Sequence, residues 1–423
     1  MKVVVIGAGV IGLASAYALR QSGHDVLVVD RQRGPGLETS YATGSLLTPS
    51  MADPWNSPGC WRDLRRSLMG RDSPLRLKFG ALPSLVCWGM RFLKHAEPRS
   101  FARAALSNIR LALYSKAAMG LLRQREPLEY DSAAHGSLRV FRNMDSLEQA
   151  TAVAERRLSE SLAFHRLSRK DVVALEPALE AISAELAGGL HYSADEVGDT
   201  YRFCVALTEA ARRMGVAFRF GTSVLAIEHG RNEVRGARIA DGRIQGDAFV
   251  VAAGSYSVPL VRSTGVSIPV RPAKGYSMTI LEQELGTRLS IPIVDDDWHV
   301  AVVPIGGSVR VAGTAEFGGY DLSIKPDRIT TLLRVLKRVL PQTTVSRDGV
   351  TPWCGLRPMS ADGVPIIGPT PFSNLFLNTG HGHLGWTMAM GSGHLLADLV
   401  SDRPPGVDPA PYAWSRFGGS RAW

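Results

Sequence analysis

Residues 1–12, MKVVVIGAGVIG, decide the fold. They place an apolar strand before three glycines spaced G-x-G-x-x-G, and a helix is expected to follow over 13–21. In this pattern Gly7 permits a tight turn, Gly9 lets the backbone approach a pyrophosphate, and Gly12 lets the helix pack closely on the strand. We therefore predict a dinucleotide site in which N–H groups at the helix N-terminus face the phosphates.

Acidic and hydroxyl residues follow at the distances that such a site needs. The next expected strand, over 26–30, ends in Asp30, which we predict binds the ribose hydroxyls. Farther along, Thr39 and Ser40 could donate their hydroxyls to the phosphates or cap a helix. Arg31, beside the acid, either contacts the adenine side or is solvated.

The size and composition describe an ordinary globular protein. A length of 423 residues predicts two or three domains, and the 45% hydrophobic content includes no apolar run long enough to span a bilayer. The N-terminus lacks the basic region and cleavage site of a signal peptide, so we expect a cytoplasmic protein. The four cysteines are scattered, which fits reduced thiols and not a typical zinc site.

The formal charge of +9 favours an anionic partner. Much of it lies in residues 61–103, where arginines alternate with apolar side chains. A helix with Trp61, Leu64 and Leu68 on one side could lie on an anionic membrane surface, or the segment could form outer helices of a domain. No nucleic-acid-binding motif accompanies the charge, so we expect no nucleic acid partner.

Nucleotide-type elements recur in separated parts of the chain. The expected elements are a helix over 201–214, strands over 217–220, 223–229 and 248–253, a hairpin around 241–242, and a strand over 375–379 followed by a helix to about 400. Residues 60–185 are helix-rich, whereas 270–316 alternate like strands of a mixed sheet. We therefore predict two interleaved domains, of which one binds the cofactor and the other covers the substrate.

With these elements placed, the chain resembles the bacterial FAD-dependent D-amino acid dehydrogenases, within the wider family of D-amino acid oxidase and glycine oxidase. The resemblance runs nearly end to end, and the order and spacing of its motifs make it specific. The motifs are LETS at 37–40, PWNSPG at 54–59, DEVGD at 195–199, GSYS at 254–257, KGYS at 274–277, GLRPM at 355–359 and NTGHGHLGWT at 378–387.

The resemblance implies an α/β fold, with a Rossmann-like FAD-binding domain of the glutathione-reductase type interleaved with an α+β substrate domain on a mixed antiparallel sheet. The FAD-binding domain is expected over 1–59, 186–258 and 345–423, and the substrate or cap domain over 60–185 and 259–344.

The implied reaction is oxidation of a D-amino acid by hydride transfer from Cα to flavin N5. Hydrolysis of the imino acid then gives a 2-oxo acid and ammonia. Electrons pass to a quinone or another respiratory-chain acceptor at the inner face of the membrane. The alternatives are an oxidase of the same fold that uses oxygen, and a D-proline or D-hydroxyproline dehydrogenase. A non-catalytic docking flavoprotein is a further alternative. The sequence does not indicate the oligomeric state.

A second glycine-rich turn, at 380–385, follows a strand and opens a helix. Such a helix N-terminus favours the negative charge of a reduced flavin. His381 and His383 lack a nearby third ligand, so we expect packing or hydrogen bonding by the flavin and no metal. The predicted FAD contacts are Gly7, Gly9, Val10, Ile11, Gly12, Asp30, Arg31, Thr39, Ser40, Thr43, Gly44, Ser45, Val224, Ala253, Gly254, Gly380, His381, Gly382, His383, Leu384, Gly385, Trp386 and Thr387.

Arg357 is the predicted substrate anchor. A guanidinium can hold a carboxylate through two parallel hydrogen bonds, and the position matches the family's carboxylate-binding arginine. The alternative is a salt bridge to Asp362. Relatives place a tyrosine hydroxyl over the flavin where this chain has Trp298. Either His299 or Tyr276 therefore supplies the polar contact, although Tyr276 could equally be core, or the pocket favours a different substrate.

Three further features leave alternatives open. The acidic loop at 195–199 could face a basic or ammonium group of the substrate, or Asp199 could cap the next helix. Lys274 resembles a position close to the flavin, and could equally pair with an acid in 295–297. Cys354 lies close enough in sequence to Arg357 to keep a covalent flavin open.

Overall fold

The computed structural model describes residues 1–60, 75–77, 82–156 and 162–418. The predicted helix around Trp61, Leu64 and Leu68 lies outside these residues. Within them the chain forms four sheets, two of which are large.

The first large sheet has six strands in the order β19-β20-β13-β1-β2-β9. Its strands pair in parallel except β19, which is antiparallel to β20. The strands are β1 (Lys2–Ile6), β2 (Asp25–Val29), β9 (Ala217–Arg219), β13 (Ala248–Val251), β19 (Ile366–Pro369) and β20 (Leu375–Thr379). Pieces from three distant parts of the sequence therefore meet in one sheet.

Both faces of this sheet are covered, as a parallel sheet requires. Alternate strand residues such as Val3 and Val5 face α1 (Val10–Gln21), α4 (Pro98–Arg125), α7 (Thr200–Arg213) and α11 (Gly385–Val400). The other residues of the alternation, such as Val4, face a small sheet of β10 (Ala226–His229), β11 (Val234–Ile239) and β12 (Gly242–Ile244).

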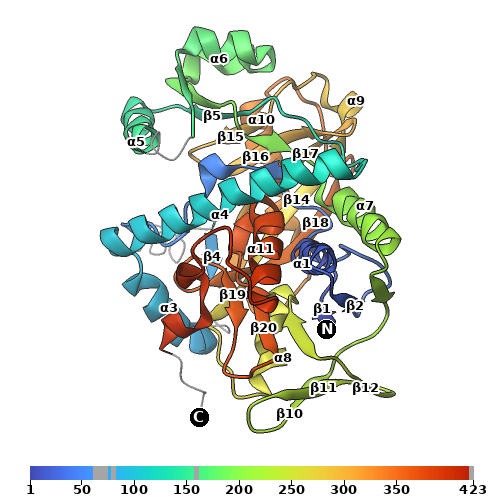
Figure 1. The fold of residues 1–423 in the computed structure, drawn as a ribbon. Helices are drawn as coiled ribbons and strands as arrows, with labels where there is room; N and C mark the ends of the chain where they lie inside the picture. The colour runs from blue at the N-terminus through green and yellow to red at the C-terminus, as the bar shows by residue number, and fades with distance from the viewer. Residues whose placement is uncertain (61–74, 78–81, 157–161, 419–423) are drawn as a thin grey trace.

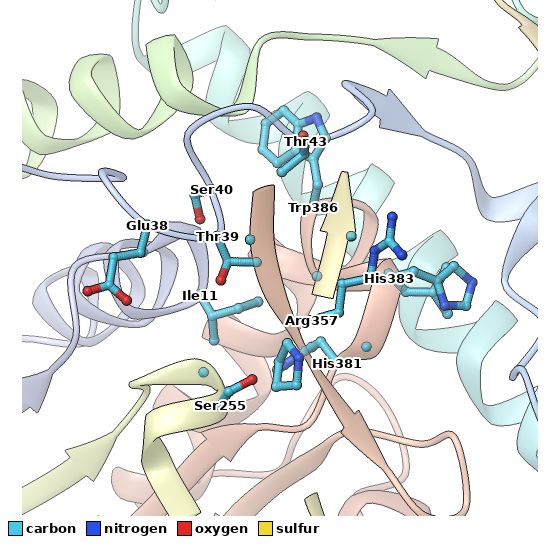
Figure 2. A pocket seen from close by; sticks show the side chains of 18 of the residues that line it. Ile11, Glu38, Thr39, Ser40, Thr43, Ser255, Arg357, His381, His383 and Trp386 are labelled. Carbon is cyan, nitrogen blue, oxygen red and sulfur yellow. The ribbon is translucent and has the colours of Figure 1, made fainter. Parts of the chain in front are cut away.

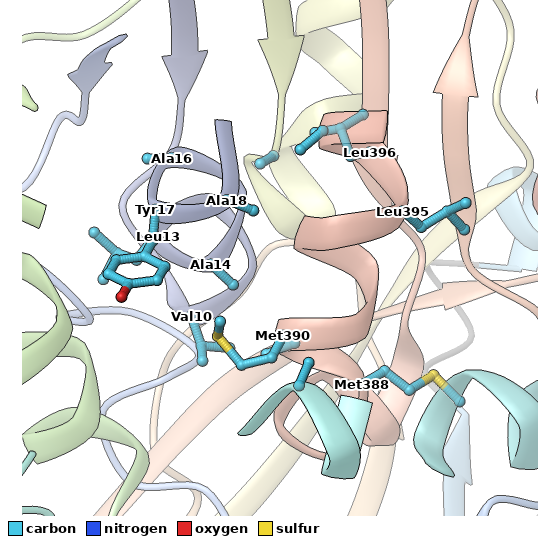
Figure 3. Close-up of a cluster of buried hydrophobic side chains, with 14 of the residues drawn as sticks. Val10, Leu13, Ala14, Ala16, Tyr17, Ala18, Met388, Met390, Leu395 and Leu396 are labelled. Carbon is cyan, nitrogen blue, oxygen red and sulfur yellow. The ribbon is translucent and has the colours of Figure 1, made fainter. Parts of the chain in front are cut away.

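Helices α1 and α11 lie side by side, with apolar side chains from both between them (Figure 3). The backbones approach so closely that a Cβ on Gly393 would lie 2.5 Å from the carbonyl oxygen of Ala14. On another side of α11, a Cβ on Gly391 would meet the backbone of α4. Glycines therefore let α11 pack between α1 and α4, and this fixes the N-termini of α1 and α11 relative to each other.

The second large sheet has nine strands, mostly antiparallel, in the order β18-β14-β17-β16-β15-β5-β7-β6, with β4 beside β17. The strands are β4 (Leu75–Leu77), β5 (Ser137–Phe141), β6 (His165–Leu167), β7 (Gly188–Tyr192), β14 (Val270–Leu281), β15 (Ile293–Asp295), β16 (Val300–Ile305), β17 (Ser308–Phe317) and β18 (Thr351–Ser360).

One face of this sheet packs against α10 (Pro326–Val339) and the segment 177–185, and Met278 and Val311 lie in that core. The remaining elements include α3 (Leu82–Lys94), α5 (Met144–Glu155), α6 (Arg169–Leu175), α8 (Ser257–Arg262), α9 (Glu282–Leu285), and the strand pair β3 (Leu46–Leu47) and β8 (Glu196–Val197). In Figure 1, α5 and α6 lie at the end opposite β10–β12.

The predicted α/β architecture is confirmed, with a mainly parallel sheet and a mixed, mainly antiparallel one. Boundaries differ in detail: α1 begins at Val10 rather than at residue 13, and β10 begins at Ala226 rather than at residue 223. β7 and β18, which the predicted ranges assign to the FAD-binding domain, pair within the nine-stranded sheet. The division into two domains stays a prediction.

Candidate functional site

A cavity of about 1360 Å³ lies between the two large sheets. Its wall includes the turn after β1, the loop 36–48, the turn after β20, and strands β14, β17 and β18 (Figure 2). Pockets for small molecules are usually about 300–1,000 Å³. The cavity is therefore large enough for an extended ligand such as a dinucleotide together with a substrate.

The glycines after β1 bring the backbone close to this cavity. Gly7 has φ +115°, and a Cβ on Gly12 would lie 1.9 Å from the carbonyl oxygen of Gly7. Gly12 therefore serves close packing, as predicted, and it does not itself line the cavity. The hydroxyl of Ser40 accepts a hydrogen bond from the N–H of Val10, at 3.1 Å, and so lies at the N-terminus of α1.

The acidic residue of the predicted site lies at the cavity wall. Asp30 accepts hydrogen bonds from the backbone N–H groups of Ala8 and Gln32, at 2.6 and 2.7 Å. Burial raises the pKa of the Asp30 carboxyl, and these two hydrogen bonds oppose the shift. Arg31 forms a salt bridge with Glu38 and lies over the ring of Tyr256, 3.8 Å from its centroid. Arg31 is thus held at the wall rather than free in solvent.

The loop after Glu38 forms turns, so Thr39 and Ser40 do not begin a helix of their own, but Ser40 does cap one, because its hydroxyl accepts from the first N–H of α1. Thr39 donates its hydroxyl to the carbonyl of Leu356, which leaves Ser40 as the hydroxyl at the helix terminus. Thr43 shares a 2.6 Å hydrogen bond with Thr200. Ser45 is fully buried with φ +57°, so this loop has a defined shape against the cavity.

The second glycine turn runs from β20 into a short 3-10 helix over 382–384 and then α11, with no side-chain cap on either helix. His381 is buried, its Nε2 is 2.9 Å from the hydroxyl of Ser392, and its Nδ1 has no partner among the described residues. His383 stacks on Trp55, and its side chain opens into the cavity. Burial lowers the pKa of the His381 imidazole to about 3, so it is neutral at pH 7. The pKa of His383, which is exposed to the cavity, is also lowered, by its partial enclosure and by the charge of Arg357.

Arg357 reaches the cavity from β18 (Figure 2). Its Nη1 donates to the carbonyl of Thr314 at 3.1 Å, and its Cζ lies 5.4 Å from the ring centroid of Trp55. The side chain occupies space left by Gly275, where a Cβ would lie 2.5 Å from Cζ. No carboxylate of the described residues pairs with it, because Asp362 binds Arg416 instead. Burial lowers the pKa of the guanidinium to about 10.

Of the other predicted substrate contacts, two line the cavity and one does not. Tyr276 lines the cavity and also belongs to the core, and its hydroxyl donates to Glu316 at 3.3 Å. His299 is exposed and lines the cavity with φ +49°. Trp298 does not line the cavity, because the turn that begins at Asp295 directs its indole against the core of the nine-stranded sheet.

The structure also decides between several alternatives. Asp199 caps α7 by accepting from the N–H of Arg202, and buried Asp195 accepts from two serine hydroxyls, so neither presents a free carboxylate to the cavity. Lys274 lies off the cavity and pairs with Glu316 and Asp321 rather than with residues 295–297. Cys354 also lies off the cavity and donates its thiol to a backbone carbonyl.

Of the predicted FAD contacts, all but Gly12 and Gly380 line the cavity, and Gly380 forms the turn at φ +81°. Sequence reasoning did not single out Thr314, Trp353 or Phe317, which line it from the nine-stranded sheet. The sequence marks Trp55 only as part of the PWNSPG motif. Strand alternation predicts that such residues face one side of a sheet, but not that this side borders the cofactor.

Neither a membrane span nor a metal site emerges from the described residues. No helix among them is both long and apolar enough to cross a bilayer. Nor do three His, Cys, Asp or Glu side chains among them gather as ligands for a metal ion.

Comparisons with known proteins agree on one family. Residues 2–399 match the family described as FAD dependent oxidoreductase. The chain is 40% identical to a D-amino acid dehydrogenase of Paramagnetospirillum magneticum, with 99% of each chain covered. It is 38% identical to one of Phenylobacterium zucineum, with 98% of this chain and 97% of the relative covered.

Solved structures show the same fold. The glycine oxidase of Geobacillus kaustophilus superimposes with a TM-score of 0.77 at 22% identity, covering 98% of both chains. The L-proline dehydrogenase of P. horikoshii gives 0.78 at 16% identity, covering 100% of this chain and 99% of that one.

Proposed function

Because the chain belongs to the FAD dependent oxidoreductase family, we propose that it oxidises D-amino acids to 2-oxo acids and ammonia with FAD as its cofactor. The observation that carries the substrate class is Arg357, a guanidinium at the cavity wall without a carboxylate partner among the described residues. Such a group gains most from a ligand that brings its own carboxylate.

The residues present fit FAD. The glycine turn after β1 would hold the pyrophosphate at the N-terminus of α1, where a side chain on Gly7 or Gly12 would collide with backbone. Asp30 would bind the ribose hydroxyls, since each carboxylate oxygen accepts more than one hydrogen bond. The uncapped turn at 380–385 would face the isoalloxazine and favour negative charge there.

FAD supplies the two-electron acceptor for oxidation of the carbon–nitrogen bond. The chain's own part is to orient the donor: Arg357 fixes the carboxylate, and Trp55 and His383 form the adjoining wall. Buried His381 is neutral at pH 7, and the pKa of His383 is lowered by enclosure and by the charge of Arg357, so neither favours a cation that would compete for the carboxylate. His299 and Tyr276 remain the proposed polar contacts, and Tyr276 is held by Glu316.

The test is anaerobic reduction of the purified holoenzyme by a panel of D- and L-amino acids that includes D-proline. We expect the visible flavin band to bleach with D-isomers only. Bleaching by L-isomers, or by none, would refute the proposed substrate class. Readmission of air or of a short-chain quinone then separates an oxidase from a dehydrogenase.

We propose a quinone as the electron acceptor. The support is α3, where Val86, Met90 and Leu93 are exposed and also line the cavity, so a lipophilic acceptor meets an apolar entrance. Reoxidation of the reduced enzyme should be faster with a ubiquinone analogue than with oxygen. Met90→Glu should slow the quinone reaction without slowing reduction by the amino acid.

A peripheral contact with an anionic membrane is proposed on charge. Arg91 and Lys94, which neighbour Met90 and Leu93 on α3, and Arg99 and Arg103 on α4 are exposed basic side chains. The protein should float with vesicles that contain phosphatidylglycerol and not with neutral vesicles, and Arg91→Glu with Lys94→Glu should abolish flotation. Equal flotation with both vesicle types would contradict an electrostatic contact.

A further inference from the structure

Thr314 is an irregular residue in an otherwise regular part of the nine-stranded sheet. Gly275 of β14 pairs with Ala315 of β17, but the next residue, Tyr276, pairs with Gly313. Thr314 is therefore the extra residue of a β-bulge, opposite no residue of β14. Bulges free backbone groups from the ladder and re-aim side chains, and they are common beside active sites.

The bulge requires a conformation that threonine disfavours. Thr314 has φ +55°, in the left-handed region where glycine is the usual residue and a β-branched side chain is an outlier. Its side chain is also unsatisfied: the residue is 6% exposed, and its hydroxyl oxygen has no hydrogen-bond partner among the described residues. Both features cost folding free energy, and glycine would remove both.

The position of Thr314 suggests why a hydroxyl is kept there. The residue lines the cavity, and its freed carbonyl accepts the hydrogen bond from Nη1 of Arg357. Its hydroxyl is thus carried on the same residue that holds the carboxylate anchor. Strained residues with unsatisfied polar groups are typical of sites whose missing partner is a ligand.

We propose that Thr314 is a second substrate-binding residue, which positions Arg357 through its carbonyl and donates its hydroxyl to the carboxylate that Arg357 holds. This inference rests on the proposed function, because it takes the ligand to be a carboxylate. Together Arg357 on β18 and Thr314 on β17, the strands on either side of β14, would supply donors from two directions and fix the rotation of the carboxylate.

Three variants of the holoenzyme test the role of the hydroxyl. Thr314→Val keeps the β-branched shape and loses only the hydroxyl, Thr314→Ser keeps a hydroxyl, and Thr314→Gly removes both strain and hydroxyl. The probe is acetate, with its Kd measured from the perturbation of the flavin spectrum. We expect Thr314→Val and Thr314→Gly to raise the Kd about tenfold or more, and Thr314→Ser to restore most of the affinity.

Thermal unfolding of the same variants separates binding from structure. Thr314→Gly should melt at a higher temperature than the wild type while it binds acetate more weakly, a combination that a purely structural role does not produce. Wild-type affinity for acetate in Thr314→Val would overturn the inference alone. Failure of acetate to bind even the wild type, with no D-amino acid reducing the flavin, would instead overturn the proposed function.

Discussion

Replacing Arg357 by methionine removes the guanidinium and keeps a side chain of similar length. The expected loss can be worked from the site. A carboxylate held by a guanidinium gains two charge-assisted hydrogen bonds, each contributing about 1.5–3 kcal/mol. The variant should therefore lose about 3–6 kcal/mol of transition-state stabilisation, which lowers kcat/KM about 150-fold to 25,000-fold. Arg357→Lys, which keeps the charge and loses the planar pair of donors, should fall between.

The same change should not weaken the fold. Burial lowers the pKa of Arg357 to about 10, which corresponds to a cost of about 3 kcal/mol for the charged form. The hydrogen bond to Thr314 returns about 1.5–3 kcal/mol, which is no more than this cost. Arg357→Met should therefore melt no lower than the wild type. Its kcat/KM for a D-amino acid should be measured by steady-state kinetics with a dye acceptor.

Arg243 gives a matched control, because it lies exposed on β12 in a salt bridge with Glu228. Arg243→Met should leave kcat/KM within about twofold of the wild type, as expected for an exposed ion pair. If Arg357→Met folds, retains FAD and keeps wild-type kcat/KM, the carboxylate-anchor argument is refuted.

Three further predictions concern packing, cofactor and pH. Gly393→Ala should lower the free energy of unfolding by about 1–3 kcal/mol, because its Cβ would lie 2.5 Å from the Ala14 carbonyl oxygen. Gly120→Ala, which has open space in α4, should raise the free energy of unfolding by about 0.5–1 kcal/mol, and urea unfolding of both variants tests this. Asp30→Asn should raise the dissociation constant of FAD about tenfold or more, measured by flavin release, and unchanged retention would remove Asp30 from the ribose site. His381 has a pKa of about 3 in the folded protein, below its unfolded value, so the unfolded state binds the extra proton. The free energy of unfolding should therefore fall by about 1.4 kcal/mol per pH unit as the pH drops below about 6.5. In His381→Asn the urea midpoint should fall less between pH 6.5 and 5.

The cofactor half of the site was predictable because its chemistry is local in sequence. Gly7 and Gly9 directly precede α1, and a strand, a glycine turn and an acid at fixed spacing are typical of dinucleotide binding. The second turn, at 380–385, could be placed for the same reason. Arg357 was predictable only through its family motif, because an isolated arginine in a strand carries no sign of its partner.

The substrate half was less predictable because strand registers determine it. Trp298 was assigned to the substrate slot by its place along the chain, but a turn beginning at Asp295 directs it into the core. The sequence suggested an acid in 295–297 as a partner of Lys274, yet the antiparallel pairing of β14 with β17 places Lys274 opposite Glu316. Neither result can be read without knowing which residues of distant strands face each other.

The position of Thr314 also depends on strand register and could not be predicted from the sequence. A single extra residue in β17 shifts the pairing with β14, and no composition or period in the sequence marks where it falls. Without that shift the Thr314 carbonyl would point along the ladder toward a neighbouring strand, and Arg357 would lose the hydrogen bond that it donates to this carbonyl. Deleting Thr314 should therefore regularise the sheet and raise the Kd for acetate. A deletion variant that folds and binds acetate like the wild type would show that the bulge has no part in holding Arg357.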